Sequence, residues 1–405
     1  MDNARAGALV VLAVSMLACE GPAAPFLRAD TRGCTSRTLV IVAHPDDDLL
    51  FVDPDVSRAI VAGSCVAVLY ITAGDDGRDA EYWTRREYGV QAAYAQMIGA
   101  ADGWVSSYAR YARRHIAAVR AASAPVWLAF LRFPDGIDGH GSEAHRGQSL
   151  AALWRDPTLR IATLDDEGAL TRAALLDFLE AMMRDVAPTE VLTLDRTGAY
   201  GADHSDHRNT ARFVLRASER VERDEPVQLT MYRGYNITDE PENLDAKASA
   251  DKRSFFSSYV VYDDALGDGH AAVVNDTYAF WYSRRYPLPA TADIAGSLVA
   301  PSGSCLSAAD GLPIRVASCD ERPAQSWVHD AAGRLRTQGG CLSASPTDAR
   351  VALAPCEDVA AQRWTQTDAN QLSALGRCLA LDAFTGTLQT AECADVSEQR
   401  WTLTS

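Results

Sequence analysis

The chain has 405 residues, enough for two or three domains, and it is acidic. Its 54 acidic side chains outnumber 38 basic ones and give a formal net charge of −16. A surface that binds a polyanion carries an excess of basic residues. The composition therefore argues against nucleic acid as a partner and against simple electrostatic attachment to anionic lipid.

The N-terminus predicts an export signal. The apolar run 7–18 is too short to span a bilayer well, but it has the length of a signal-peptide core. Residues 16–19 resemble a bacterial lipobox, which would make Cys19 the lipidated residue of a cell-envelope lipoprotein. An ordinary cleaved signal peptide is the alternative, and on either interpretation the mature protein is exported, with a lipid anchor as its one route to a membrane. We assign 1–19 to the signal and 20–35 to a linker.

The cysteines support export. Nine are present, and eight remain once Cys19 is lipidated or removed. Cysteines that occur in pairs in an exported chain are typical of disulfides. The eight pair by position: Cys34 with Cys65, Cys305 with Cys319, Cys341 with Cys356, and Cys378 with Cys393.

An apolar run followed by a histidine and three aspartates forms the first candidate site. Residues 39–43 are continuously apolar, which favours a strand buried on both faces, and Pro45 ends that strand because proline cannot donate to a sheet. His44 and Asp46–Asp48 are then presented at the carboxyl end of a central strand, where open α/β sheets bind ligands. Imidazole and carboxylate together suit zinc, whereas a turn with a capping aspartate is the alternative.

A second stretch has the same character. Residues 191–195 predict another short strand, and residues 198–208 follow it with two histidines three positions apart. If a helix starts near Ser205, His204 and His207 both face one point around its first turn. The two strand ends therefore predict two halves of one site.

These stretches resemble the motifs of the PIG-L/LmbE-like zinc deacetylases, which remove an acetyl group from N-acetylglucosamine-type amino sugars. The family's A-H-P-D-D-E motif corresponds to Ala43–Asp48, in which Asp48 replaces the final glutamate. Its H-x-D-H motif corresponds to His204–His207. The resemblance covers about residues 36–290 and implies one zinc ion per chain.

The resemblance also implies roles for individual residues. It implies three zinc ligands: His44, Asp47 and His207. It makes Asp46 the general base and gives His204 the task of stabilising the oxyanion or acting as an acid. Asp206 is expected to orient a histidine from behind.

Residues from three further segments are candidates for contacts with substrate. Asp75 lies in an acidic glycine loop at the same sheet edge. Arg86 and Glu87 lie near the start of a predicted helix, where the family often has an arginine and a glutamate that face the sugar; solvated surface charges are the alternative. His140, in the turn-rich loop 133–141 that is a candidate lid, and His145 after it could also contact the substrate, and loop histidines without a role are the alternative.

A threefold repeat follows a proline-containing linker at 287–292. Gln-x-Trp recurs with Trp327, Trp364 and Trp401 spaced by 37 residues, and Cys-Leu recurs in each repeat. Repeats of this size cannot bury a core alone, which predicts a pseudo-symmetric assembly. The pattern resembles the ricin B-type β-trefoil over about residues 295–405.

The trefoil lacks the sugar-binding residues that the resemblance implies. In that family an aspartate usually follows Cys-Leu, and an aromatic residue stands two positions before the second cysteine. The aspartate positions hold Ser307, Ser343 and Ala380, and the aromatic positions hold Ala317, Ala354 and Ala391. Without carboxylate and stacking face, a structural or protein-binding role is as well supported as a glycan partner.

The sequence therefore predicts a Rossmann-like three-layer α/β sandwich with a mostly parallel sheet, followed by an all-β trefoil. The predicted function is that of an exported zinc-dependent hydrolase that removes the acetyl group from an N-acetylglucosamine-type sugar or glycoconjugate. Two alternatives stay open: a non-catalytic cell-surface carbohydrate-binding protein, and an amidase acting on another N-acyl amine.

Overall fold

The structure is a computed structural model that describes residues 33–404 with internal gaps. The gaps are 101–102, 113, 199, 222–226, 267–277, 290–293, 309–312, 321, 331, 368–369 and 383–384. The predicted signal peptide with Cys19, and nearly all of the linker 20–35, lie outside the described residues.

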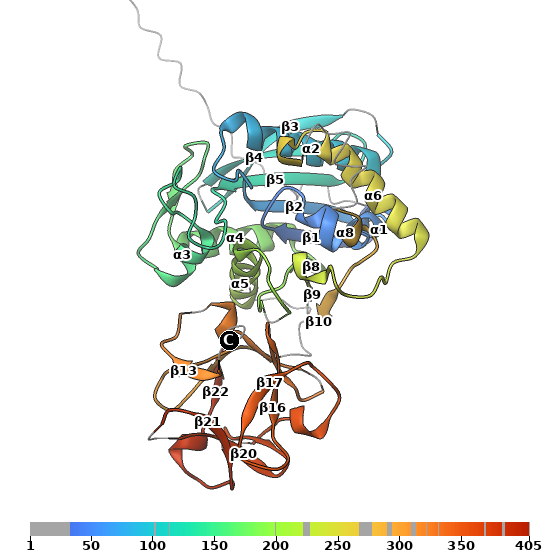
Figure 1. Cartoon of the computed structure of the whole chain (residues 1–405). Coiled ribbons are helices and arrows are strands. Elements are labelled where there is room, and N and C mark those ends of the chain that lie inside the picture. Colours follow the sequence, from blue (N-terminus) through green and yellow to red (C-terminus); the bar gives the residue numbers. More distant parts are fainter. Residues whose placement is uncertain are drawn as a thin grey trace, which may run out of the picture.

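The first domain is built on an eight-stranded mixed sheet (Figure 1). The five middle strands are parallel, and antiparallel strands lie at both edges. The strand order is β10 (Pro287–Pro289), β9 (Gln228–Tyr232), β8 (Glu190–Leu194), β1 (Arg37–Val42), β2 (Cys65–Thr72), β5 (Val126–Phe133), β4 (Arg114–Ala121) and β3 (Trp104–Tyr111). The apolar run before His44 is thus a central strand, as predicted.

Helices cover both faces of this sheet because its strands are apolar on both sides. Successive residues of a strand point to opposite faces. Leu39 and Ile41 pack with α3, α4 and α5, whereas Val40 and Val42 pack with α2 and α6. The helices are α1 (Asp55–Val61), α2 (Ala80–Met97), α3 (Leu150–Arg155), α4 (Arg172–Val186), α5 (Ser205–Glu219), α6 (Ala246–Val260) and α8 (Ala279–Tyr282). The predicted three-layer α/β architecture is confirmed.

Two parts of the sheet differ from the sequence prediction. The hairpin of β3 and β4 was not predicted, because the outer strand β3 is partly exposed and lacks the continuous apolar run of the central strands. Residues 287–289, predicted as linker, form β10 and pair with β9. Prolines fit there because β10 is an edge strand.

The four predicted disulfides are all present. Cys34–Cys65 joins the segment before β1 to the start of β2, whose parallel register sets Arg37 opposite Cys65. The other three each close a loop within one repeat of the second domain: Cys305–Cys319, Cys341–Cys356 and Cys378–Cys393. Such a set of disulfides is typical of proteins from oxidising compartments.

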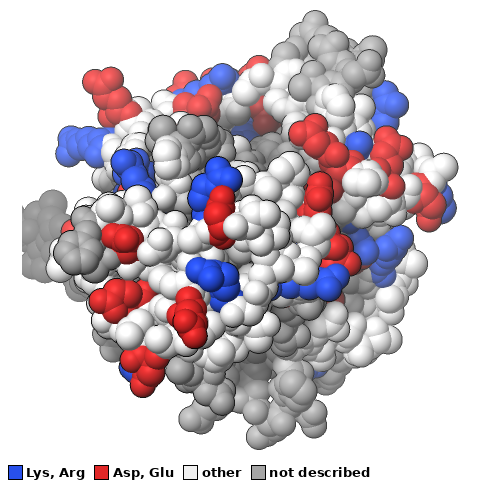
Figure 2. All heavy atoms as spheres, turned by 60° about the horizontal axis from the view of Figure 1, so that its bottom comes forward, with Lys and Arg blue, Asp and Glu red and all other residues white. Residues whose placement is uncertain are grey.

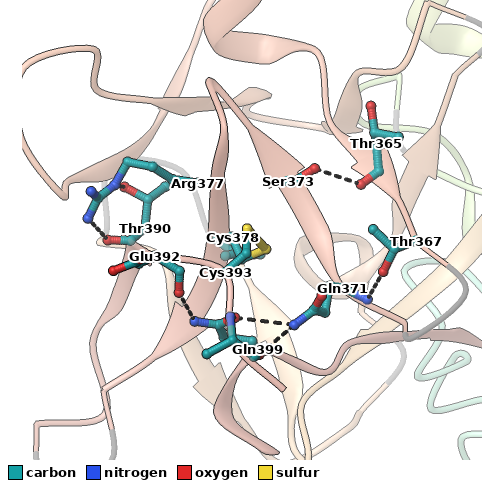
Figure 3. The surroundings of a disulfide bond; sticks show 12 residues. Thr365, Thr367, Gln371, Ser373, Arg377, Cys378, Thr390, Glu392, Cys393 and Gln399 are labelled. Atoms are coloured by element: carbon teal, nitrogen blue, oxygen red, sulfur yellow. Dashed lines mark hydrogen bonds between the residues drawn. A yellow bond between two sulfur atoms is a disulfide. The ribbon is translucent and has the colours of Figure 1, made fainter. Parts of the chain in front are cut away.

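The second domain is a β-trefoil that repeats one set of hydrogen bonds three times. In each repeat the buried Gln-x-Trp tryptophan donates its Nε1–H to the carbonyl oxygen of the Cys-Leu leucine, at 2.8 to 3.0 Å. The glutamine spans the preceding turn. Gln399, beside the Cys378–Cys393 disulfide in Figure 3, accepts from the Ala394 N–H and donates to the Glu392 carbonyl. The motif therefore joins the strands around the core of the trefoil.

The trefoil strands are short. They are β11 (Ile294–Val299), β12 (Cys305–Ser307), β13 (Arg315–Ala317), β14 (Trp327–His329), β15 (Leu335–Thr337), β16 (Gly340–Ala344), β17 (Val351–Ala354), β18 (Thr365–Gln366), β19 (Leu372–Ala374), β20 (Arg377–Leu381), β21 (Leu388–Ala391) and β22 (Thr402–Thr404). Figure 2 turns the trefoil end toward the viewer, and the visible acidic and basic side chains lie interspersed on that face. None of the helices in the described residues has the length and apolar character to cross a membrane.

Candidate metal and catalytic site

The two predicted half-sites come together at the carboxyl edge of the sheet. His44 follows β1, while His204 and His207 lie at the start of α5, which follows β8. The ring centroid of His44 lies 4.4 Å from that of His204 and 5.3 Å from that of His207. The centroids of His204 and His207 are 5.5 Å apart, so the three imidazoles surround one point.

Because of a tight turn after β1, the adjacent Asp46 and Asp47 contact different residues. The N–H groups of Asp46 and Asp47 both donate to the His44 carbonyl, at 2.8 and 3.3 Å. The chain then enters a π-helical turn, η1 (Asp48–Val52). Asp47 is fully buried and lies 2.9 Å from His207 Nε2, whereas Asp46 Oδ2 lies 2.9 Å from a nitrogen of Arg86.

His207 is fixed between two carboxylates. Its Nδ1 lies 2.9 Å from Asp203 Oδ1, which also accepts the N–H groups of His204 and Tyr235. Because Asp203 holds the Nδ1–H, Nε2 faces Asp47. Burial lowers the pKa of His207, but the charges of Asp47 and Asp203 outweigh it and raise that pKa to about 10. A positive charge, from a proton or a metal ion, is strongly favoured between His207 and Asp47.

His204 is a neutral donor that remains partly accessible. It caps α5, and its Nδ1 accepts the Asp206 N–H at 3.2 Å. Nε2 therefore carries the proton, and it lies 3.5 Å from Asp135 Oδ1. Burial, with the charge of His44 beside it, lowers the pKa of His204. An N–H that points into the site can stabilise negative charge developing on a substrate.

Asp206 and Asp135 flank His44. Asp206 Oδ2 lies 3.5 Å from His44 Nε2 and accepts the Gly136 N–H at 2.7 Å; its expected role of orienting a histidine stays a prediction. A Cβ on Gly136 would come within 2.4 Å of Asp206, which explains the glycine. Asp135 Oδ2 lies 3.8 Å from His44 Nε2.

Asp46 is held by a buried arginine. Arg86 is 7% exposed and also contacts Asp263 at 3.1 Å and the Tyr259 hydroxyl at 2.6 Å. The interpretation of Arg86 as a solvated surface charge is therefore wrong. Gly74, at a φ of +57°, accepts a hydrogen bond from the same guanidinium, and a Cβ there would overlap it. Burial raises the pKa of Asp46 to about 6, although Arg86 opposes this rise.

Glu87 is also buried rather than solvated. Its two carboxylate oxygens accept bidentate hydrogen bonds from Arg132 on β5, at 2.7 and 2.8 Å. Asp48, which stands in place of the family's glutamate, accepts hydrogen bonds from the hydroxyls of Tyr70 and Tyr94 at 2.9 and 2.5 Å. Burial raises the pKa of Asp48 to about 7. Both carboxylates therefore have partners within the protein.

The structure also places Asp75 and His140, two further predicted substrate contacts. Both oxygens of Asp75 are used within the protein: Oδ1 accepts the Asp135 N–H at 2.7 Å, and Oδ2 lies 2.6 Å from His145 Nε2. Asp75 is fully buried, and we assign it a structural role in place of the predicted substrate contact. His140 lines a cavity next to the site, on the side of the second domain.

Three residues that lie at the site were not predicted from the sequence. Asp135 follows β5 at the same sheet edge as His44, so the strand-end signal used for His44 was present there too. Asp203 lies within the stretch already singled out. Tyr235, whose ring stacks on His207 at 5.3 Å with an interplanar angle of 19°, comes from η2 (Tyr235–Ile237) and carries no sequence signal.

The donor atoms of this site fit a divalent cation. Three overlapping groups have ligand atoms within 4.8 Å of one another: His44, His204 and His207; His44, Asp135, His204 and Asp206; and His44, Asp46 and Asp47. His44 Nε2, His207 Nε2 and Asp46 Oδ1 are buried and make no hydrogen bond within the described part of the chain. Nitrogen and carboxylate donors gathered in this way suit zinc.

Each of the two domains matches the model of a known protein family. Residues 39–218 match the family described as GlcNAc-PI de-N-acetylase (PIG-L), and residues 295–405 match the ricin-type β-trefoil lectin domain. The chain carries a PIG-L domain followed by a ricin B-type domain.

Curated relatives of the first domain are deacetylases by name. A 1D-myo-inositol 2-acetamido-2-deoxy-α-D-glucopyranoside deacetylase of Gordonia bronchialis is 27% identical over 48% of this chain and 61% of its own length. One of Thermobifida fusca is 24% identical over 68% of this chain and 88% of its own length. The chain spans 54% to 61% of the length of the first three relatives that it matches.

Solved structures resemble each domain separately. A deacetylase of the teicoplanin biosynthesis pathway is 16% identical, covering 60% of this chain and 88% of its own, with a TM-score of 0.36. A non-toxic homologue of type II ribosome-inactivating proteins from Momordica charantia, solved with α-methyl-D-galactoside, is 18% identical. It covers 29% of this chain and 50% of its own, with a TM-score of 0.27.

Proposed function

We propose that this protein is a zinc-dependent N-deacetylase that acts on an N-acetylglucosamine-type amino sugar or glycoconjugate. The observation that carries the proposal is that two adjacent aspartates contact different groups. Asp47 Oδ1 lies against His207, whereas Asp46 Oδ2 pairs with Arg86 and leaves Asp46 Oδ1 beside the ligand cluster. One site thus offers a metal-ligand cluster with a separate carboxylate beside it.

We assign His44, Asp47 and His207 as the residues that hold one zinc ion. The 2.9 Å approach of Asp47 Oδ1 to His207 Nε2 supports the assignment, because two lone pairs this close need a cation between or beside them. When bound, zinc supplies Lewis acidity toward water and toward the acetyl carbonyl. Asp203 orients His207 through its contact with the ring Nδ1, and Asp206 places a second carboxylate 3.5 Å from His44 Nε2.

Asp46 is the general base in this proposal. Arg86 holds Oδ2, and Oδ1 is left without a hydrogen-bond partner in the described residues, so Oδ1 can take the proton of the attacking water. The water oxygen bonds to the amide carbon, and the C–N bond then breaks. Asp46 returns the proton to the departing amine, which regenerates the carboxylate. Products are acetate and the free amino sugar.

His204 stabilises the oxyanion that forms when water attacks the carbonyl carbon. Its Nε2–H is available because Nδ1 is occupied by the Asp206 N–H. Its lowered pKa keeps the ring neutral near pH 7, so it donates a hydrogen bond without adding a second full charge beside His44.

We further propose that the protein acts outside the cytoplasm, as a lipoprotein anchored through Cys19 or as a secreted protein. The four disulfides support an oxidising compartment. Mass spectrometry of the mature N-terminus would distinguish a lipidated Cys19 from a simple cleaved end.

The proposed activity is tested by metal analysis combined with an amine-release assay. We expect one zinc per purified chain, and release of acetate from N-acetylglucosamine conjugates that stops on chelation and returns with added zinc. If zinc is bound but amine appears only from other N-acyl amines, the substrate class is wrong. If N-acetyl substrates bind but no amine is released from any of them, the chain is a non-catalytic carbohydrate-binding protein.

A further inference from the structure

The trefoil contacts the catalytic domain at the loop that leads to α5. The Ser326 hydroxyl donates a hydrogen bond to the Thr197 carbonyl. Fully buried Val328 packs against Tyr200, and the guanidinium of Arg336 lies 4.5 Å from the centre of the Tyr200 ring. The first trefoil repeat therefore lies against the segment that ends in Asp203 and His204, and Figure 1 shows the trefoil below α5.

This contact makes the trefoil part of the wall beside the candidate active site. A cavity of about 470 Å³ is lined by His204, Asp203 and Tyr235 of the catalytic domain. Pro323 of the trefoil lines the same cavity. A substrate that reaches His204 from this side therefore comes close to the first trefoil repeat.

A second cavity continues from the first between the two domains. It measures about 480 Å³ and shares four lining residues with the first: Asp138, Ser205, Arg208 and Pro323. We call it the interdomain cavity. It is lined by four arginines, three from the catalytic domain and one from the trefoil: Arg155, Arg208, Arg212 and Arg322.

The charge of the interdomain cavity is opposite to that of the chain. Its lining holds four arginines against two aspartates, Asp138 and Asp320, whereas the whole chain has a net charge of −16. An acidic protein repels anions in general, so a local excess of guanidinium groups is what an anionic ligand would need. Guanidinium groups bind phosphate and carboxylate through paired, charge-assisted hydrogen bonds.

We propose that the interdomain cavity binds an oxyanion carried by the substrate, a phosphate or a carboxylate, while the acetamido group lies at His204. The proposal rests on the proposed deacetylase function and narrows its substrate class to anionic amino sugars. It also gives the trefoil a role that needs none of the missing sugar-binding residues. The trefoil contributes Arg322 and Pro323 to the substrate cavity.

Two arginines can be neutralised without disturbing the reacting groups. Arg322 is 75% exposed in its side chain, and Arg155 is also exposed, so neither substitution removes a buried group. Arg350 is a matched control for Arg322, because each arginine pairs with an aspartate two residues earlier in the trefoil. The Arg350 side chain is 83% exposed, and it does not line the cavity.

The test measures binding by titration calorimetry on the full zinc-loaded chain carrying Asp46→Asn, in which hydrolysis of the ligand is suppressed, and hydrolysis is assayed separately on the chain with Asp46 intact. The ligands are N-acetylglucosamine, its 1-phosphate and 6-phosphate, and N-acetylmuramic acid, which carries a carboxylate. We expect at least one anionic sugar to bind about tenfold or more tightly than N-acetylglucosamine. This preference should fall in Arg322→Gln and Arg155→Gln, persist in Arg350→Gln, and weaken with added salt. The preferred ligand identifies phosphate or carboxylate as the bound group.

Equal affinity for neutral and anionic sugars would overturn the proposal, as would an equal loss of the preference in Arg350→Gln. Because binding is measured without turnover, the two proposals can fail separately. Hydrolysis of N-acetyl sugars without any anion preference would leave the deacetylase and remove the anion site. An Arg322-dependent anion preference without hydrolysis would leave the anion site and remove the enzymatic function.

Discussion

The two domains use buried polar groups in opposite ways. In the trefoil each buried glutamine and tryptophan has its partners, and the same hydrogen bonds recur in all three repeats. At the carboxyl edge of the sheet, imidazoles and carboxylates crowd together, and His44 Nε2, His207 Nε2 and Asp46 Oδ1 find no hydrogen-bond partner in the described residues. Satisfied polar groups stabilise a scaffold, whereas unsatisfied ones grouped at a strand end indicate chemistry.

The difference also predicts which domain should tolerate change. The trefoil depends on local loops, each closed by its own disulfide, so its stability is spread over equivalent parts. The candidate metal site depends on groups that follow β1 and β5 or begin α5 and that meet at one place. Loss of one group there should remove function rather than merely weaken the fold.

The largest expected effect is loss of the metal. His44→Ala and His207→Ala should each abolish stoichiometric zinc and turnover, because a site with three protein ligands retains zinc poorly with two. Metal analysis of the purified variants measures this. His329→Ala, which removes a trefoil histidine bonded to the Trp364 carbonyl, is the control and should keep its zinc. One tightly bound zinc per chain in both site variants would contradict the ligand assignment.

The next effect concerns the disulfides. Reduction should destabilise the trefoil more than the catalytic domain, since three of the four disulfides lie there and each closes a loop of about 15 residues, worth about 3 kcal/mol. Denaturant unfolding with and without reductant separates the two domains when zinc release follows the first domain and hydrogen exchange of trefoil peptides, read by mass spectrometry, follows the second. A larger shift in the zinc-release transition would show that Cys34–Cys65 matters more than the trefoil set.

The smallest effect is a shift in pH dependence. Asp46 must be ionised to accept a proton, and its pKa is raised to about 6, so kcat/KM should fall as the pH drops through about 6. Arg86 favours the carboxylate and lowers that pKa. Arg86→Gln should therefore move the acid limb to higher pH by roughly one unit, whereas Arg86→Lys keeps the charge and should leave it nearly unchanged. An unshifted limb in Arg86→Gln would mean that Asp46 is not the titrating base.

Most of the architecture could be predicted because its signals are local. The apolar run before His44, the strand before residue 198 and the 37-residue tryptophan spacing each report a single element or repeat. The hairpin of β3 and β4 escaped prediction because a half-exposed edge strand has no strong pattern. The edge strand β10 was hidden by its two prolines, which favour a linker when no partner strand is known.

The site was predictable where residues lie next to one another in the sequence, and not where the fold joins distant ones. Arg86 lies 40 positions after Asp46, and nothing in a helix start shows that its guanidinium turns inward. Tyr235 reaches His207 from beyond α5. The approach of Pro323 and Arg322 to the cavity near His204 depends on how the two domains pack, which no motif in either domain encodes.

The roles of the adjacent aspartates are tested most directly by measuring zinc content and turnover of Asp46→Asn and Asp47→Asn side by side. We expect Asp46→Asn to keep one zinc per chain and its substrate affinity while kcat falls by roughly 100-fold or more, the usual effect of losing a general base. Asp47→Asn should lose zinc, because an amide is a poorer ligand than a carboxylate. If Asp46→Asn loses its zinc while Asp47→Asn keeps both zinc and activity, the roles are reversed, and if both variants remain fully active, this sheet edge is not the active site.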